Sequence, residues 1–126
     1  SALLPASKAL EIDAKAVSRD PSVVEAYVAD PLVHHDNIPA RMVVSLFDEG
    51  QFVVDNAGHI TLPVLLLHGE EDQLTSVPAS RQFIEALRAS DKHLTVYPGM
   101  YHELFNEPER DEIIDTCIAW IRQRLV

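Results

Sequence analysis

One short, continuous apolar run constrains the fold of this chain more than any other segment. Residues 62–68 read LPVLLLH, and Gly69 ends the run. The run is too short for a buried helix and lacks the alternation of a half-exposed strand, which indicates a strand covered on both faces. Such strands belong to parallel sheets that carry helices on both sides, so the run predicts an α/β fold.

A helix, a second strand and a last helix follow this run. A helical pattern begins at Pro78, and the alternating residues His93–Tyr97 predict a second strand that Pro98 ends. A last helix opens at Glu107 and carries a long apolar stripe, on which we expect a buried thiol. The stripe consists of Ile113, Ile114, Cys117, Ile118, Ile121 and Leu125. A strand–helix–strand order implies a parallel pair joined by a right-handed crossover.

The first part of the chain, residues 1–60, carries only helical and irregular patterns. Weak helical character extends over Ser7–Ala16. Asp20 then predicts the start of a helix that ends at Asp30, because proline follows each of these aspartates. A longer helix opens at Ile38.

The chain therefore divides into a helical region, residues 1–60, and a βαβα region, residues 61–126. Two parallel strands do not make a stable sheet, since their faces and edges need neighbours. No other segment of the sequence predicts a strand. We expect the missing strands to come from another chain or from an N-terminal half that this sequence lacks.

Charge and composition exclude several classes of function. The chain has 126 residues and a formal net charge of −10, which disfavours binding to nucleic acid or adsorption to anionic lipid by charge alone. Its longest apolar run is far shorter than the roughly 20 residues of a membrane span. A single cysteine gives no disulfide framework, and the N-terminus does not resemble a signal peptide, so we expect a cytoplasmic protein.

Two polar side chains follow the two predicted strands. Asp72 lies four residues past the first strand and His102 five residues past the second. The carboxyl ends of parallel strands meet at one edge of a sheet, where sites of α/β proteins lie. There a carboxylate can fix the tautomer of an imidazole and stabilise its cationic form.

Each of these residues also has a structural interpretation. Asp72 suits a turn or a helix cap, with Glu70 and Glu71 as alternative acids on the same loop. His102 suits a loop histidine bonded to backbone. We interpret His68, at the strand end, as a packed residue behind the site rather than a catalytic one.

A histidine pair in the first region invites a metal interpretation that we do not favour. His34 and His35 precede Asp36, but adjacent histidines point apart and no third ligand follows at a helical spacing. We expect a solvated loop there and no metal or organic cofactor in the protein.

Three separated segments resemble the α/β-hydrolases, most closely the monoacylglycerol lipase and lysophospholipase group. Residues 65–74, LLLHGEEDQL, resemble the loop that carries the acid in this group, and residues 97–104, YPGMYHEL, resemble its histidine loop. Residues 29–33, ADPLV, are similar to a segment just after the cap. The resemblance implies that Asp72 is the triad acid and His102 the general base and acid, in the order of that superfamily.

The nucleophile of such a triad has no counterpart in the sequence. The G-x-S-x-G element needs a serine between glycines two residues away on each side. The glycines are Gly50, Gly58, Gly69 and Gly99, and none frames a serine. The resemblance therefore implies the C-terminal part of an α/β-hydrolase fold: residues 1–60 as the end of the cap with a connecting helix, and residues 61–126 as core. We expect the isolated chain to be inactive.

The resemblance implies a carboxylic-ester hydrolase that acts on a small lipid ester such as a monoacylglycerol or lysophospholipid. Its partner would be the N-terminal half with the nucleophilic serine, or a swapped copy, and the apolar stripes of the cap allow transient contact with a membrane. Two alternatives stay open. The chain is a non-catalytic fragment or swapped-dimer module, or it belongs to a related hydrolase of amides, peptides or thioesters.

Overall fold

The computed structural model describes residues 8–125. Strands and α-helices alternate in its second half, and short 3-10 helices connect several of them. In chain order the elements are β1 (Lys8–Leu10), η1 (Ala14–Ala16), α1 (Pro21–Ala29), β2 (Ile38–Pro39), α2 (Ala40–Asn56), η2 (Ala57–His59), β3 (Val64–Gly69), α3 (Val77–Ala86), β4 (Lys92–Tyr97), η3 (Leu104–Asn106) and α4 (Arg110–Arg122).

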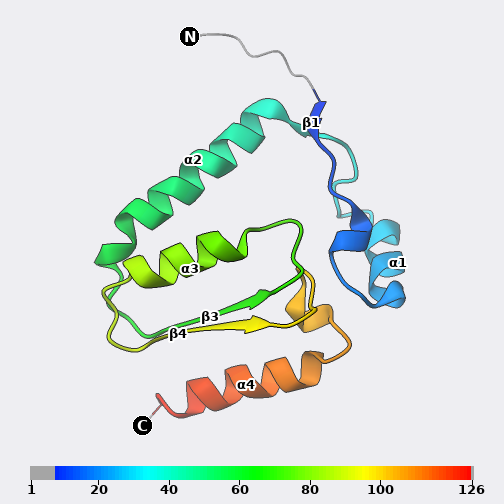
Figure 1. Ribbon diagram of the computed structural model, residues 1–126. Helices are drawn as coiled ribbons and strands as arrows, with labels where there is room; N and C mark the ends of the chain where they lie inside the picture. Colours follow the sequence, from blue (N-terminus) through cyan, green and yellow to red (C-terminus); the bar gives the residue numbers. More distant parts are fainter. Residues whose placement is uncertain (1–7, 126) are drawn as a thin grey trace, which may run out of the picture.

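The centre of the fold is the parallel pair β3–β4. Its register runs from Val64 opposite Lys92 to Gly69 opposite Tyr97. Helix α3 lies on one side of the pair and α4 on the other, while α2 crosses beyond α3 (Figure 1). The predicted βαβα unit with a parallel pair is therefore confirmed, and both strands end at the same edge.

Local chemistry explains where two of the helices begin. The Asp20 side chain accepts a hydrogen bond from the Ser22 amide, and Pro21 follows as the first residue of α1. At α3 the Ser76 hydroxyl accepts from the Ala79 amide in the same way. Both caps satisfy amides that have no partner within the first turn of a helix.

Two small apolar clusters hold the layers together. On the α3 side the buried residues are Ala57, Leu87 and Ala89, and on the α4 side they are Met100, Leu104 and Ile113. The leucines of β3 are only half-buried, although their sequence predicted a strand covered on both faces. Within residues 8–125, β3 has β4 as its one neighbouring strand, so its other edge is left open.

Helix α2 presents an apolar surface to solvent. Phe47 is 76% exposed and Phe52 61% exposed. Met42, Val44, Leu46 and Val53 of the same helix are also exposed. Met42, Leu46 and Val53 share one face of the helix, whereas Phe47 and Phe52 lie on other sides, and none of them finds a core among the described residues.

Two expectations for the first region are wrong. The sequence predicted no strand before residue 62, yet β1 pairs with β2 as an antiparallel ladder, Lys8 opposite Pro39 and Leu10 opposite Ile38. The weak helix expected over Ser7–Ala16 reduces to the 3-10 turn η1, and Ser7 lies outside the described residues. Strands of two or three residues are too short to leave a period in the sequence.

The last helix begins later than expected. The sequence placed its start at Glu107, but α4 starts at Arg110. The Glu107 side chain is fully buried and accepts hydrogen bonds from the Arg19 backbone amide, at 3.0 Å, and from the Arg19 guanidinium. It therefore binds a distant segment instead of interacting with its own helix end.

Candidate active site

The two loops that follow β3 and β4 are joined by backbone hydrogen bonds. The amide of Glu70 donates to the Tyr97 carbonyl and the amide of Glu71 to the Met100 carbonyl, each at 2.9 Å. Gly99 takes a positive φ of 71°, a conformation that glycine adopts without strain, and it turns the second loop back toward the first. The loops therefore lie side by side.

Asp72 occupies a cage of donors from its own loop. Its Oδ1 accepts from the amides of Leu74, at 2.7 Å, and Thr75, at 3.0 Å. Its Oδ2 accepts from the Thr75 hydroxyl at 2.5 Å. The side chain is only 3% exposed, so these bonds fix a carboxylate that is almost removed from water.

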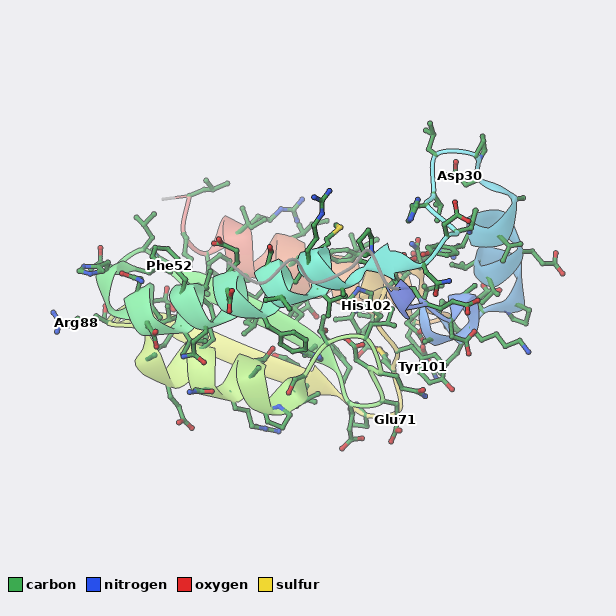
Figure 2. The ribbon with its side chains drawn as sticks, turned by 90° about the horizontal axis from the view of Figure 1, so that it is seen from above. Asp30, Phe52, Glu71, Arg88, Tyr101 and His102 are labelled. Atoms are coloured by element: carbon green, nitrogen blue, oxygen red, sulfur yellow. The ribbon has the colours of Figure 1, made fainter. Side chains whose placement is uncertain are left out.

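His102 approaches this carboxylate from the second loop. Its Nδ1 lies 2.9 Å from Asp72 Oδ2, across 30 residues of sequence. The imidazole is 37% exposed, and its Nε2 bonds to no other described residue. In Figure 2, His102, Tyr101 and Glu71 lie in the middle part of the molecule, between Asp30 toward one end and Phe52 and Arg88 at the other.

The surroundings of Asp72 decide its charge. Burial of the carboxyl raises its pKa, but the hydrogen bonds from the Thr75 hydroxyl, His102 and the amides of Thr75 and Leu74 outweigh burial and lower the pKa to about 2. Asp72 is therefore ionised at neutral pH. An ionised acceptor at Nδ1 keeps the proton of a neutral imidazole on that nitrogen and leaves Nε2 as a base.

The structure brings together two of the residues that the sequence singled out on these loops. Asp72 and His102 are in contact, whereas the alternative acids Glu70 and Glu71 are exposed. The sequence analysis did not foresee Thr75, whose hydroxyl and amide both bind Asp72. The spacing of an aspartate three residues before a threonine was the available signal, since it favours such local bonds.

The remaining histidine candidates behave differently. His68 is buried and lies close to Asp72, in agreement with its interpretation as a packed residue behind the site. His34 and His35 are exposed, and the His35 ring meets Tyr27 edge-on with centroids 5.9 Å apart. Across residues 8–125 no cluster of three or more acidic, histidine or cysteine side chains could hold a metal ion.

An apolar cavity opens beside the imidazole. Its volume is about 470 Å³, and its lining includes Leu65, Leu67, His102, Phe105 and Cys117. The thiol expected to be buried is therefore only partly covered, because it faces this cavity rather than a packed core. The cavity places apolar surface next to a nitrogen that can move a proton.

Comparison with known proteins decides the family. A family model described as "Serine aminopeptidase, S33" matches residues 1–109. The chain belongs to this family of α/β-hydrolases. The family and the fold class expected from the sequence, the C-terminal part of an α/β-hydrolase, are confirmed.

The relatives of the chain are longer proteins. It is 45% identical to "Monoacylglycerol lipase" from Mycolicibacterium smegmatis, over 98% of this chain and 44% of that protein. It is 30% identical to "Monoglyceride lipase" from Rattus norvegicus, over 98% of this chain and 41% of the relative. The crystal structure of Paleococcus ferrophilus monoacylglycerol lipase superposes with a TM-score of 0.80 at 37% identity, over 88% of this chain and 44% of that one. The chain thus spans less than half the length of these relatives.

None of the helices within residues 8–125 combines the length and apolar character needed to cross a membrane.

Proposed function

We propose that this chain supplies the acid and the general base of a serine hydrolase that cleaves carboxylic esters. Asp72 is the acid, His102 is the base, and a serine outside this sequence is the nucleophile. The observation that carries the proposal is the 2.9 Å contact between His102 Nδ1 and the buried carboxylate of Asp72, with Nε2 facing away from that contact.

The geometry supports one sequence of proton transfers. Nε2 of His102 takes the hydroxyl proton while the serine oxygen attacks the ester carbonyl, and Asp72 stabilises the imidazolium that forms. The same Nε2 then gives the proton to the departing alcohol, and the acyl group stays on the serine oxygen as an acyl-enzyme. A water molecule then gives a proton to Nε2 and attacks the acyl carbonyl. The bond to the serine oxygen breaks, the carboxylic acid is released, and Nε2 returns the proton to the serine oxygen.

We further propose a small lipid ester of the monoacylglycerol or lysophospholipid class as the substrate. Support comes from the lipase names of the relatives and from the apolar cavity beside His102. The family description, an aminopeptidase, favours peptides or other amides as a second candidate. Comparing the hydrolysis of a 1-monoacylglycerol, an acyl thioester and an aminoacyl 4-nitroanilide decides between these bonds.

The partner that we propose is the remaining part of the same hydrolase. It would cover exposed apolar residues of α2, such as Phe47 and Phe52, and the open edge of β3, and residues 1–60 would complete its cap. The same exposed residues of α2 offer a surface for a transient lipid contact. Co-expression of residues 1–126 with a second polypeptide that carries a G-x-S-x-G serine tests this arrangement, and a dimer of this chain alone would favour the swapped or non-catalytic alternative.

The decisive experiment uses the longest natural polypeptide that contains residues 1–126. It is treated with a fluorophosphonate probe, and intact masses are recorded for the wild type, His102→Gln and the exposed control His93→Gln. We expect one probe per wild-type and control molecule and almost no labelling of His102→Gln. Equal labelling of all three would refute the role of His102, and an unlabelled wild type would refute the proposed function.

A further inference from the structure

A second histidine lies close to the same oxygen of Asp72 that His102 contacts. His68 stands near the end of β3, one residue before Gly69, and is 7% exposed. Its Nε2 lies 3.2 Å from Asp72 Oδ2 and 3.4 Å from the Thr75 hydroxyl, and its Nδ1 lies 2.7 Å from the Ser80 hydroxyl on α3. The mechanism above does not use this imidazole.

The contacts decide where its proton lies. A lone pair on Nε2 would face the Asp72 carboxylate at 3.2 Å, and two acceptors repel each other at that distance. Nε2 therefore carries the proton, and it donates to the Thr75 hydroxyl oxygen at 3.4 Å. The Thr75 hydroxyl in turn donates to Asp72 Oδ2. In the neutral imidazole Nδ1 is then an acceptor, and the Ser80 hydroxyl donates to it.

We propose that His68, held by Ser80, is a positioning residue that acts through the Thr75 hydroxyl and fixes Asp72 Oδ2 for its contact with His102. The inference rests on the proposed function, since it concerns the acid of that triad. Two ring nitrogens lie close to Asp72 Oδ2, that of His102 at 2.9 Å and that of His68 at 3.2 Å. The side chains of His68 and Ser80 come from β3 and α3, so they link the carboxylate to the rigid layers rather than to its own loop.

The loop alone leaves this oxygen less constrained. Backbone amides bind Oδ1, whereas the only donor from the loop to Oδ2 is the Thr75 hydroxyl, which can rotate. The buried imidazole of His68 has a fixed plane, so its N–H holds the Thr75 oxygen in place and leaves the hydroxyl proton directed at Oδ2. Replacing His68 therefore frees the oxygen that binds His102, even where the fold is unchanged.

The test uses variants of the longest natural polypeptide that contains residues 1–126. His68→Leu removes the N–H and His68→Gln retains one at a similar reach, while Ser80→Ala removes the hydroxyl that orients the ring. The matched controls are His93→Gln, on the exposed side of β4, and Ser45→Ala, whose hydroxyl bonds only to its own helix at the Arg41 carbonyl.

Hydrolysis of 4-nitrophenyl butyrate gives the first measurement. We expect kcat to fall about tenfold in His68→Leu and less in Ser80→Ala, with KM unchanged, because misplacement of a catalytic group affects the chemical step. His68→Gln restores most of the rate. A residue that only packs would lower thermal stability without this split between kcat and KM. Equal kcat in His68→Leu, His68→Gln and the control variants would overturn the proposal.

Nuclear magnetic resonance of 15N-labelled histidine gives a measurement that does not depend on activity. The Nδ1 proton of His102, bonded to Asp72, should broaden or shift in His68→Leu and stay in place in His68→Gln and both controls. An unmoved resonance in His68→Leu overturns the positioning role. If the wild type hydrolyses no ester but the resonance still responds, the proposed function fails while the contact from His68 through Asp72 to His102 stands.

Discussion

A Cβ atom at Gly69 would lie 2.2 Å from the carbonyl oxygen of Tyr101. It would also lie 2.4 Å from the Met100 carbonyl oxygen, and both of these atoms belong to backbone that cannot move aside as a side chain does. The end of β3 thus passes directly against the residues that precede His102. The absence of a side chain at position 69 is what allows the histidine loop to approach Asp72.

Gly69→Ala should therefore separate the two halves of the site. The added methyl group must displace the Met100–Tyr101 backbone, and His102 moves with it. We expect labelling by a fluorophosphonate to slow by about a hundredfold, as for a catalytic group misplaced by about 1 Å. Gly50→Ala is the matched control, since a Cβ there meets nothing within 4 Å and alanine stabilises the middle of a helix. Equal rates in the two variants would contradict the steric argument.

Asp72→Asn should leave the loop in place but reverse the tautomer of His102. An asparagine oxygen can still accept from the amides of Leu74 and Thr75, so its NH₂ group faces His102 Nδ1. Nδ1 must then accept, and Nε2 carries the proton and cannot act as a base. We expect ester hydrolysis to fall by about 10³- to 10⁴-fold at neutral pH. Histidine 15N shifts check the cause, and a His102 that keeps its proton on Nδ1 would contradict it.

The lowered pKa of Asp72 predicts a loss of stability in acid. The carboxyl has a pKa of about 2 in the folded chain, below its ordinary 3.8, so folding favours the ionised form. Its contribution, about 2 kcal/mol, is complete above the ordinary value and disappears as the pH falls through 3.8 toward 2. Urea unfolding near neutral pH and in acid, near pH 2, measures the free energy of unfolding of the wild type and of Asp72→Asn. The difference between the two proteins should be smaller in acid. The exposed Asp48→Asn should show no such change.

The sequence predicted those parts of the fold that leave a period or a cap. The apolar run of β3, the alternation of β4 and the Asp20 cap of α1 are local signals, and the structure confirms each of them. The meeting of Asp72 and His102 followed from topology, because parallel strands end at one edge.

Contacts between distant segments were beyond such reasoning. Arg19 and Glu107 lie 88 residues apart, and neither breaks the pattern around it. The contact between His68 and Ser80 depends on which face of β3 the His68 side chain takes and on where Ser80 lies in the first turns of α3. The half-burial of β3 depends on its neighbours in space, which the sequence of the strand does not describe.

Glu107 joins the first region of the chain to the histidine loop, and its charge should be necessary for this contact. One oxygen accepts from the Arg19 backbone amide and the other from the Arg19 guanidinium, in a side chain with no exposed surface. Nearby, the Glu103 amide, next to His102, donates to the Val17 carbonyl at 2.8 Å. In Glu107→Gln the amide nitrogen must face one of the two donors.

We expect Glu107→Gln to lower the free energy of unfolding by about 1–3 kcal/mol, the cost of leaving a buried donor unpaired. Glu109→Gln is the matched control, because Glu109 binds the same guanidinium from an exposed position and its loss should cost about 0.5 kcal/mol or less. Denaturant unfolding of both variants checks the difference. A cost for Glu107→Gln no larger than for Glu109→Gln would mean that the buried contact does not hold the histidine loop to residues 17–19.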